Sequence, residues 1–512
     1  MEIEQELSLP TVFDAPKLVT SSDAFPLPEQ HIQYRTLNKA DPKLREIFPR
    51  LYRWLDQLSG QRSYTLIEDS SSLKPFFDIF DYLRSNGIVE RFTFQRVQYH
   101  DAPSFYRCDV FADYPAGTTD GIVRNRAIGH GFGKNILIVL SKAIGEFLER
   151  YFLTLYHHNQ LLRSPYTSLY QRGIKALDPT TLPGFTREQK DRYPTRNFNK
   201  ESIFRWETAR RVSTGEKILV PAQLVYFSYA FSPTEPEPVL VETNTNGAGG
   251  YFTTNGAILS GIYELIQRDA FLIYWLNTLT PPRIDPESIP DDNFLVLLKE
   301  AKRYGFEVQC LNTTLDTNVP SFAVVIIDRT GRGPYFSLGA GCGADPTKAL
   351  TRAFEEAWSV YYWIRPHKIY LLPGRYEAFF DYSVGQDERL RLAANIEMAQ
   401  RYQFFISGEI QKFQNLTFDY PRTFSSEHEE LSFLVKRIES LGPDYQVLYF
   451  PPKHPILDRL GYSSCQVIIP PLTPLYLRET LAPLAAGRLQ EVPKRLGFKQ
   501  NTRLNTFPHP FP

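Results

Sequence analysis

Cysteine is scarce in this chain, with only four residues among 512. They are Cys108, Cys310, Cys342 and Cys465, which lie far apart and include no C-x-x-C pair. That spacing excludes a zinc site built on paired cysteines, and it also excludes the dense disulfide framework of small secreted proteins. We therefore expect four reduced thiols.

The sequence also lacks an excess of either charge. It has 57 basic and 57 acidic side chains, which gives no general reason to expect a nucleic acid or a membrane as partner. The N-terminal residues Met1-Glu-Ile-Glu-Gln-Glu are acidic and contain no apolar run, so they do not resemble a secretory signal. No uncharged stretch is long enough to span a bilayer. These absences, with 42% hydrophobic residues, predict a cytoplasmic globular enzyme.

The familiar glycine motifs for phosphate are absent as well. No G-x-x-x-x-G-K-[ST] loop occurs, and no G-x-G-x-x-G opens a helix. The segment Gly131-Phe-Gly133-Lys134 is only a partial glycine loop. A nucleotide, if one binds, must therefore be held by a different arrangement.

What the chain does contain is a repeated helical pattern. Glu146-Phe-Leu-Glu149-Arg150 and Glu264-Leu-Ile-Gln267-Arg268 each place an acid, an acid or amide and an arginine within one turn. Side chains at these spacings share one face of a helix. One interpretation is a solvated salt-bridge face. The other is a site for an anion and a metal, because Mg²⁺ prefers oxygen ligands and arginine matches phosphate oxygens.

The second copy follows the glycine-rich segment Asn246-Gly-Ala-Gly-Gly250. We expect a turn there, whose flexible backbone and free N–H groups approach phosphate closely.

The two copies resemble the YcaO family, which carries a Thr-Asn-Gly turn before a helix ending in Glu-x-x-(Glu or Gln)-Arg-Asp-Ala. The segment Ala143-Ile-Gly145-Glu146-Phe-Leu-Glu149-Arg150-Tyr151 is similar to the first helix of that family. The segment Asp345-Pro346-Thr-Lys-Ala349-Leu350-Thr-Arg352-Ala353-Phe-Glu355-Glu356-Ala357 resembles a third family helix. Pro508-His-Pro510-Phe-Pro512 resembles the P-x-P-x-P terminus of the azoline-forming members.

This resemblance implies an α+β, YcaO-like fold with long helices on mixed or antiparallel sheets, and ATP and Mg²⁺ as cofactors. It implies ATP-dependent cyclodehydration of Cys, Ser or Thr in a ribosomally made precursor peptide to thiazoline or oxazoline. The residues it assigns to nucleotide are Lys134, Glu146, Arg150, Asn246, Arg268, Arg352 and Glu356. Those it assigns to the metal are Glu149, Glu264 and Gln267. Pro508, Pro510 and Pro512 form the tail, in which the terminal carboxylate assists proton transfer.

Four positions depart from the family pattern: Phe132 stands where many members have lysine, Lys142 where serine is frequent, Gly256 for a glutamate and Ser359 for a glutamine. Gln267 replaces a glutamate, and an amide ligates Mg²⁺ without the charge. Backbone thioamidation therefore remains an alternative, as does a nucleotide-inactive scaffold that binds a peptide or a partner enzyme.

The resemblance also implies partners. Nothing in the chain looks like a fused leader-binding E1-like protein, so we expect that protein to be a separate chain acting on the same precursor peptide. A flavin-dependent azoline dehydrogenase and a second copy of this chain, forming a homodimer, are further candidate partners. The sequence identifies neither the peptide nor its modified residue.

We expect three regions: an extended proline-rich arm over residues 1–45, an α/β portion over 46–115, and the YcaO-like catalytic domain over 116–512. Helices are predicted at 47–60, 73–86, 257–275, 292–304, 346–363, 388–403 and 428–441, with a first long helix ending at His157-His158. Strands are predicted at 91–99, 105–111, 217–231, 306–312, 322–328 and 465–469. The polar stretch 178–200 is expected to be a loop or an insertion.

Overall fold

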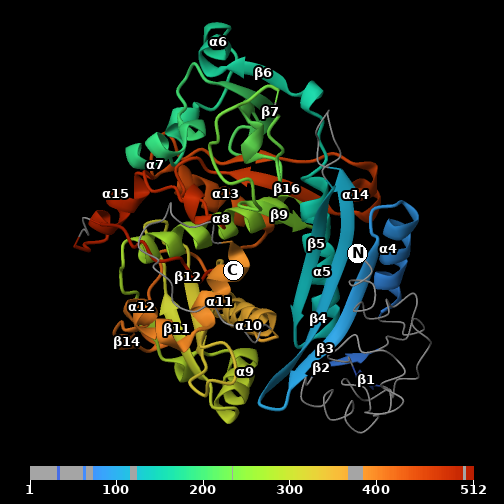
Figure 1. The fold of residues 1–512 in the computed structure, drawn as a ribbon, viewed down its shortest axis with the longest axis vertical. Helices are drawn as coiled ribbons and strands as arrows, with labels where there is room; N and C mark the ends of the chain where they lie inside the picture. Colours follow the sequence, from blue (N-terminus) through green and yellow to red (C-terminus); the bar gives the residue numbers. More distant parts are fainter. Residues whose placement is uncertain are drawn as a thin grey trace. The chain divides into compact units, whose positions relative to one another are not determined.

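The computed structural model describes residues 73–115, 124–232, 234–366, 385–499 and 503–512, together with the short strands β1 (Ile32–Tyr34) and β2 (Gln61–Tyr64) (Figure 1). The chain divides into two compact units. Unit 1 comprises Met1–Tyr114 and Arg124–Tyr151, and unit 2 comprises Pro115–Val123 and Phe152–Pro512. Most of the first long helix is grouped with the N-terminal sheet in unit 1.

Unit 1 is a five-stranded sheet in the order β1-β2-β3-β4-β5. Its longer elements are α4 (Lys74–Ser85), β3 (Arg91–Tyr99), β4 (Ala102–Pro115), β5 (Arg124–Gly133) and α5 (Ile136–Phe152). Phe80 of α4 stacks on Phe92 of β3 with ring centroids 3.8 Å apart, and both rings are fully buried. The apolar face of α4 thus covers the sheet.

Unit 2 contains two sheets. One has the order β13-β12-β11-β10-β14, and the other has the order β6-β7-β15-β16-β9 with β8 paired to β7. The pairings are antiparallel except for β10 with β14. The strands are β6 (Leu162–Pro165), β7 (Ile203–Arg211), β8 (Lys217–Pro221), β9 (Ala248–Tyr251), β10 (Arg283–Ile284), β11 (Glu307–Asn312), β12 (Ser321–Ile327), β13 (Phe336–Cys342), β14 (Ile410–Gln411), β15 (Leu448–Phe450) and β16 (Ser463–Ile468).

The helices of unit 2 cover these sheets. They are α6 (Tyr166–Gln171), α7 (Arg187–Arg192), α8 (Thr254–Leu276), α9 (Asp292–Arg303), α10 (Pro346–Ile364), α11 (Gln386–Ala394), α12 (Ala399–Tyr402), α13 (Glu427–Glu439), α14 (Pro455–Leu460) and α15 (Arg488–Arg495). Helix α8 contacts β9 and β16 of one sheet and β12 and β13 of the other. Because it is covered on most sides, α8 is apolar around most of its circumference. The predicted α+β class is confirmed.

Local sequence explains where the two long helices of unit 2 begin. Thr253 precedes α8, and its hydroxyl accepts the N–H of Gly256 at 3.0 Å. Asp345 precedes α10, where its carboxylate accepts the N–H groups of Thr347 and Lys348, and Pro346 occupies the first turn. Both are N-caps that satisfy donors left open by the helix.

Most predicted elements are confirmed within about two residues, but three predictions were wrong. The strand predicted over 217–231 ends at Pro221, where a proline and a 3₁₀ turn interrupt it. The helix predicted over 388–403 breaks at Asn395, which is extended and caps the following turn. The first long helix ends at Phe152, and His158 is buried in a separate turn. The helix predicted over 47–60 and almost all of the 1–45 arm lie outside the described residues.

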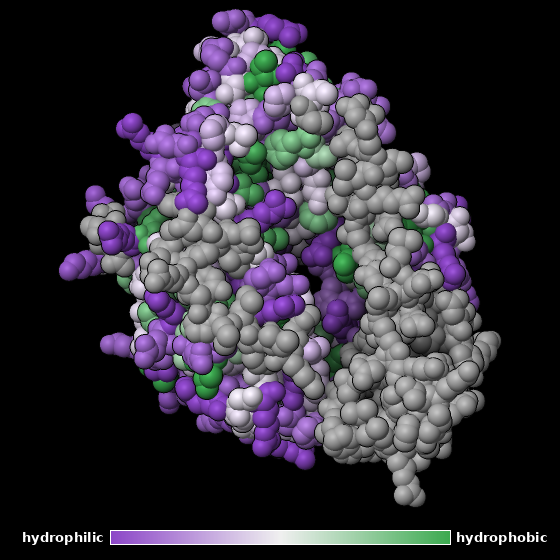
Figure 2. Space-filling model, viewed as in Figure 1, coloured by the Kyte–Doolittle hydropathy of each residue, from purple (hydrophilic) through white to green (hydrophobic). Residues whose placement is uncertain are grey.

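Figure 2 shows a surface that is mostly hydrophilic where described residues are drawn, with small, separate hydrophobic areas. No helix in the described part of the chain is long and apolar enough to cross a membrane. All four cysteines are buried, and none of them forms a disulfide bond. Burial raises the pKa of the thiols of Cys108, Cys310 and Cys342.

Candidate functional site

The helices that carry the repeated glutamates pack on glycine-containing strands, and the same strand–helix arrangement occurs three times. The glycine pairs are Gly129 and Gly131 on β5 against α5, Gly247 and Gly249 at β9 against α8, and Gly339 and Gly341 on β13 against α10. A Cβ on the second glycine of each pair would lie 1.9–2.2 Å from a helix carbonyl oxygen eight residues later. Only glycine permits this contact between strand and helix backbones.

The same register places one glutamate of each helix against its strand. Glu146, Glu264 and Glu356 each lie 17 positions after the first glycine of their copy. They accept backbone N–H bonds from His130 at 2.5 Å, Gly247 at 2.7 Å and Ala340 at 2.6 Å, respectively. Each carboxylate is therefore fixed by a strand of its own unit.

In the first two copies the arginine one turn later completes the arrangement. Arg150 pairs with Glu146 at 2.5 Å and Arg268 pairs with Glu264 at 2.8 Å. Arg150 also donates to the Ile128 carbonyl at 2.8 Å, and Arg268 donates to the Asn246 side-chain oxygen at 2.8 Å. Ile128 and Asn246 occupy the same place, one residue before the first glycine. The two arginines are thus held in the same way.

Each of these arginines keeps one donor for another group. The Nε atoms of Arg150 and Arg268 are buried and have no hydrogen-bond partner among the described residues. Gln267 makes no hydrogen bond within the described residues either, and its side chain is half-buried. A guanidinium donor and an amide oxygen fit phosphate and Mg²⁺, respectively. Within each unit, the side chains present are therefore compatible with groups of a Mg·nucleotide: Arg150 in unit 1, and Arg268 with Gln267 in unit 2.

The side chain of Asn246 is engaged within unit 2. Its oxygen also accepts the N–H of Leu475 at 3.2 Å, and its amide donates to the Leu475 carbonyl at 2.7 Å. Asn244 donates to the same carbonyl at 2.9 Å. Asn246 therefore joins Arg268 to the chain at Leu475.

Lys134 is engaged within unit 1, where it donates to the Ser104 carbonyl at 2.8 Å and lies over the Phe105 ring. The neighbouring His130 contacts the buried carboxylate of Asp109 at 2.7 Å. Burial by itself would raise the pKa of Asp109, but the charge of Arg107 and the contact with His130 lower it to about 2. These residues form a fixed polar group beside β5.

The third strand–helix copy, β13 with α10, lacks the second acid and the arginine that the first copy has. Arg352 is exposed and donates to the Cys342 carbonyl at 3.0 Å, while Ser359 and Val360 stand at the positions of Glu149 and Arg150 in the first copy. The described residues contain no cluster of three His, Cys, Asp or Glu side chains that could hold a metal ion. A Mg²⁺ bound with a nucleotide takes most of its ligands from phosphate and water, so it needs no such cluster.

The turn predicted over Asn246–Gly250 is confirmed at Asn246 and Gly247, where Gly247 has a φ of 82°, but Ala248–Tyr251 is strand β9. Gly131 and Gly133, the partial glycine loop before the first helix, lie at the end of strand β5. The glycines serve the close approach to α5 and α8 described above. Two of the departures from the family pattern have local causes as well. Phe132 stacks on Phe105, and a Cβ at Gly256 would lie 2.1 Å from the Tyr251 ring.

The proline-containing tail lies in the core of unit 2. Residues 507–511 are buried, and the Phe507 carbonyl accepts the indole N–H of Trp275 at 3.1 Å. Phe511 packs on Phe271 with ring centroids 4.7 Å apart. Phe271 and Trp275 follow Arg268 on α8, so one helix carries both the glutamate–arginine face and the contacts with the tail.

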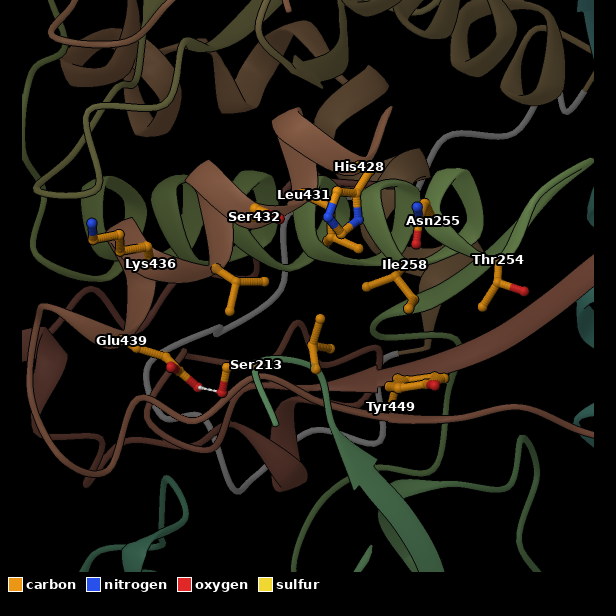
Figure 3. A pocket seen from close by; sticks show the side chains of 12 residues that line it. Ser213, Thr254, Asn255, Ile258, His428, Leu431, Ser432, Lys436, Glu439 and Tyr449 are labelled. Carbon is orange, nitrogen blue, oxygen red and sulfur yellow. Dashed lines mark hydrogen bonds between the residues drawn. The ribbon is translucent and has the colours of Figure 1, made fainter. Parts of the chain in front are cut away.

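A pocket of about 450 Å³ lies in unit 2 between α13, the first turns of α8 and β7 and β15 (Figure 3). Its lining includes Asn255, His428 and Lys436, and Glu439 is bonded to Ser213 at its rim. None of the site residues predicted from sequence lines it. Its position therefore gives no support to a role in nucleotide binding.

Comparison with known proteins identifies the family. A model of the YcaO cyclodehydratases, described as ATP- and Mg²⁺-binding, matches residues 138–473. The chain belongs to the YcaO family. This membership assigns ATP and Mg²⁺ to the protein as cofactors.

Relatives and solved structures agree with this membership. An uncharacterized protein of Methanothermobacter thermautotrophicus is 26% identical over 295 residues, which cover 57% of this chain and 68% of the relative. A heterocyclase in complex with substrate and cofactor is similar with a TM-score of 0.67 at 20% identity, over 86% of this chain and 57% of that chain. YcaO from Methanopyrus kandleri, bound with AMPPCP and Mg²⁺, gives a TM-score of 0.54 at 16% identity, over 78% of this chain and 91% of that chain.

These likenesses confirm the YcaO-like fold. The chain spans little more than half of the heterocyclase it matches.

Sequence reasoning missed a buried ionic group behind the helix α8 motif. Asp269, directly after Arg268, binds Arg488 of α15 at 2.6 Å, and Arg488 also binds Asp316 at 2.8 Å. These three side chains are at most 3% exposed. The sequence does signal such a group, because Asp269 stands within an apolar run and a buried charge requires a partner. No pattern in the sequence identifies Arg488 as that partner.

Proposed function

We propose that this protein catalyses ATP-dependent cyclodehydration of Cys, Ser or Thr residues in a ribosomally made peptide, giving thiazolines or oxazolines. One observation carries the proposal: α8 holds the Glu264–Arg268 pair and, two turns later, the aromatic contacts of the Pro508–Pro512 segment. Membership of a cyclodehydratase family and the likeness to a heterocyclase support it.

The reaction balances without an oxidant. The side-chain sulfur or oxygen of the peptide attacks the preceding amide carbon and forms the ring bond, and its proton is removed. The amide oxygen then takes the γ-phosphoryl group, and the bond to ADP breaks. Loss of the amide N–H proton and departure of phosphate, with cleavage of the carbon–oxygen bond, leave the carbon–nitrogen double bond of the azoline.

We assign the charge-bearing roles by what each side chain has available. We assign Arg150 and Arg268 to phosphate, because the Nε atom of each has no hydrogen-bond partner among the described residues. Mg²⁺ neutralises phosphate charge, and Glu149 and Gln267 supply oxygens for it or its waters. Glu146, Glu264 and Glu356 accept backbone N–H groups at or next to the strands, Glu146 and Glu264 also fix Arg150 and Arg268, and we assign Glu264 to the metal as well.

The other residues predicted from sequence receive supporting roles. Lys134 and Asn246 position the phosphate-binding residues, because their side chains are bonded to Ser104 and Leu475. Arg352 lies on the exposed side of α10 and faces nucleotide. The Pro508–Pro512 segment assists proton transfer.

The substrate is a peptide whose leader is bound by a separate E1-like protein. The test incubates this protein with a Cys/Ser/Thr-rich precursor peptide, Mg·ATP and the leader-binding protein, and measures the mass of the peptide. We expect an ATP-dependent loss of one water per modified residue. A gain of sulfur in place of oxygen would establish thioamidation instead, and an unchanged mass with confirmed peptide binding would favour the scaffold.

Site variants check the residue roles in the same assay. Glu149→Ala and Glu264→Ala should each abolish peptide-dependent ATP turnover. Glu300→Ala on α9 is the control, because it removes a carboxylate that is not part of the repeated motif. Intact turnover in the first two variants would contradict the site assignment.

A further inference from the structure

The tail is seated on three ionisable side chains that the sequence motifs do not include. Arg389 on α11, Glu479 in the turn after residue 478, and His509 of the tail are at most 1% exposed. All three belong to unit 2. Ionisable side chains are rarely buried unless they are paired. The burial of three of them beside the tail therefore suggests that they have a role there.

His509 is bound on both sides of its ring. One ring nitrogen, Nδ1, accepts the Phe511 N–H at 3.3 Å, and Nε2 lies 2.9 Å from the Tyr476 carbonyl. This places the proton on Nε2, which donates to that carbonyl. Burial, followed by the charge of Arg389, lowers the pKa of His509 well below its ordinary value, so the ring is neutral. The surroundings of His509 therefore favour the neutral form of its ring. We call Arg389, Glu479 and His509 together the seat of the tail.

Arg389 contacts the tail with only part of its guanidinium. Its Nη1 donates to the Tyr476 carbonyl at 2.9 Å and lies against the His509 ring. The same Nη1 is 3.9 Å from Glu479. Nε and Nη2 of Arg389, and both carboxylate oxygens of Glu479, are buried without a hydrogen-bond partner among the described residues. Arg389 therefore lies between the Tyr476 carbonyl, to which it donates a hydrogen bond, and Glu479, to which it does not.

The groups around Glu479 set its charge. They are Arg389, Glu242 and Tyr476. Burial raises the pKa of Glu479 to about 7, against the charge of Arg389 and together with that of Glu242. Near neutral pH the carboxyl group is thus divided between its protonated and ionised forms.

The seat is continuous with the glutamate–arginine face of α8. Segment 475–478 contributes Leu475, which binds Asn246, and Tyr476, whose carbonyl binds Arg389 and His509. The next N–H groups along this segment donate to Glu242. Arg268 is joined to Asn246. One short segment therefore lies between the phosphate-facing arginine and the tail.

We infer that Arg389, Glu479 and His509 are positioning residues that seat the Pro508–Pro512 segment beside α8, with Arg389 shared between the tail and Glu479. When Glu479 is protonated, Arg389 donates to the Tyr476 carbonyl, the acceptor that it shares with Nε2 of His509, and the tail is held. When Glu479 is ionised, it draws Arg389 toward itself and the tail is released. The role in catalysis rests on the proposed function, but the seating does not.

The experiment measures hydrogen exchange of the peptide that covers residues 503–512 by mass spectrometry, in the full-length protein between pH 6 and pH 8. Rates are corrected for the intrinsic pH dependence of exchange. We expect protection of the tail amides to fall as pH rises through about 7. In Glu479→Gln, which is neutral at every pH, protection should stay at the low-pH level throughout.

Two further variants make the test specific. His509→Ala should raise tail exchange at least about tenfold, whereas His509→Gln, which keeps a donor for the Tyr476 carbonyl, should recover part of the protection. Thr506→Ala alters an exposed tail residue outside the seat and serves as the matched control. Equal exchange in wild type, His509→Ala and Glu479→Gln, or protection that rises with pH in wild type, would overturn the inference.

Peptide modification is measured on the same samples. If the proposed function holds, His509→Ala should lose modification at least tenfold while nucleotide affinity changes less than about twofold. If wild type does not modify the peptide, the proposed function fails, and the exchange data still decide whether the seat exists.

Discussion

Arg268 donates a hydrogen bond of 2.8 Å to the side-chain oxygen of Asn246, and that oxygen also accepts the backbone N–H of Leu475. The arginine of the second glutamate–arginine pair is thus oriented by an asparagine that is itself fixed to a distant part of the chain. Asn246 is thus a support for the side chain that we propose to bind phosphate, and this positioning role differs from a direct contact between Asn246 and nucleotide.

We therefore expect Asn246→Ala to weaken binding of Mg²⁺ and a non-hydrolysable ATP analogue by about tenfold, or about 1.4 kcal/mol, measured by calorimetry. Asn244→Ala is the matched control, because it removes a bond to the Leu475 carbonyl and the acceptor of the Asn246 N–H but leaves the Asn246 side chain in place for Arg268. Asn246→Asp keeps an acceptor for Arg268 and should bind better than Asn246→Ala. Weaker binding by the aspartate would place residue 246 against phosphate.

At Gln267 we predict a substitution that strengthens Mg²⁺ binding. Gln267→Glu adds a carboxylate where the family pattern has one, and Mg²⁺ binds a carboxylate more strongly than an amide. The Mg²⁺ concentration that half-saturates nucleotide binding should fall several-fold. Gln403→Glu, which makes the same charge change at an exposed position on another element, should leave it unchanged. An unchanged or higher Mg²⁺ requirement in Gln267→Glu would remove this residue from the metal site.

The strand–helix contact can be tested with a single methyl group. In Gly249→Ala the new Cβ would lie 2.2 Å from the Ala257 carbonyl oxygen, so β9 and α8 must separate. We expect a loss of at least about 2 kcal/mol in the free energy of unfolding, measured by urea denaturation. Gly184→Ala is the control in the same unit, since its nearest contact would be 3.9 Å. Equal stability of the two variants would show that α8 adjusts freely.

Acid should weaken unit 1 through Asp109. The folded pKa is about 2 and the ordinary value is 3.8, so the stabilisation is present above about pH 4 and is lost as pH falls toward 2. The shift corresponds to about 2 kcal/mol. The difference in unfolding free energy between wild type and Asp109→Asn should shrink by about that amount between pH 5 and pH 2. A difference that stays constant with pH would mean that Asp109 is not held ionised.

Periodicity and capping signals were sufficient for the long helices. The helix predicted over 346–363 agrees with α10 within one residue, whereas the one predicted over 257–275 omits the first three residues of α8, whose N-cap is Thr253. The strands next to these helices were missed, because β9 and β13 are rich in glycine and carry little strand propensity. Their conformation comes from packing on the helix, which a local pattern does not express.

In the candidate site as well, contacts between near neighbours in sequence were predicted, and contacts between distant residues were not. Glu146–Arg150 and Glu264–Arg268 were predicted as pairs because their spacing of four residues fixes a shared helix face. The bonds from Glu146 to His130 and from Asn246 to Leu475 join residues 16 and 229 positions apart. The seat of the tail depends on Arg389 and Glu479, which stand in no recognisable motif. Contacts of this kind follow from the tertiary fold alone.

The buried cysteines have a practical consequence for assays of this protein. Thiolate is the form that reacts with alkylating agents, and burial both blocks access to the four thiols and disfavours the thiolate at Cys108, Cys310 and Cys342. An alkylating reagent added to the native protein with a cysteine-containing peptide will therefore label the peptide first. The count of labelled peptide thiols before and after reaction then gives the number of cysteines converted to rings, without removal of the enzyme.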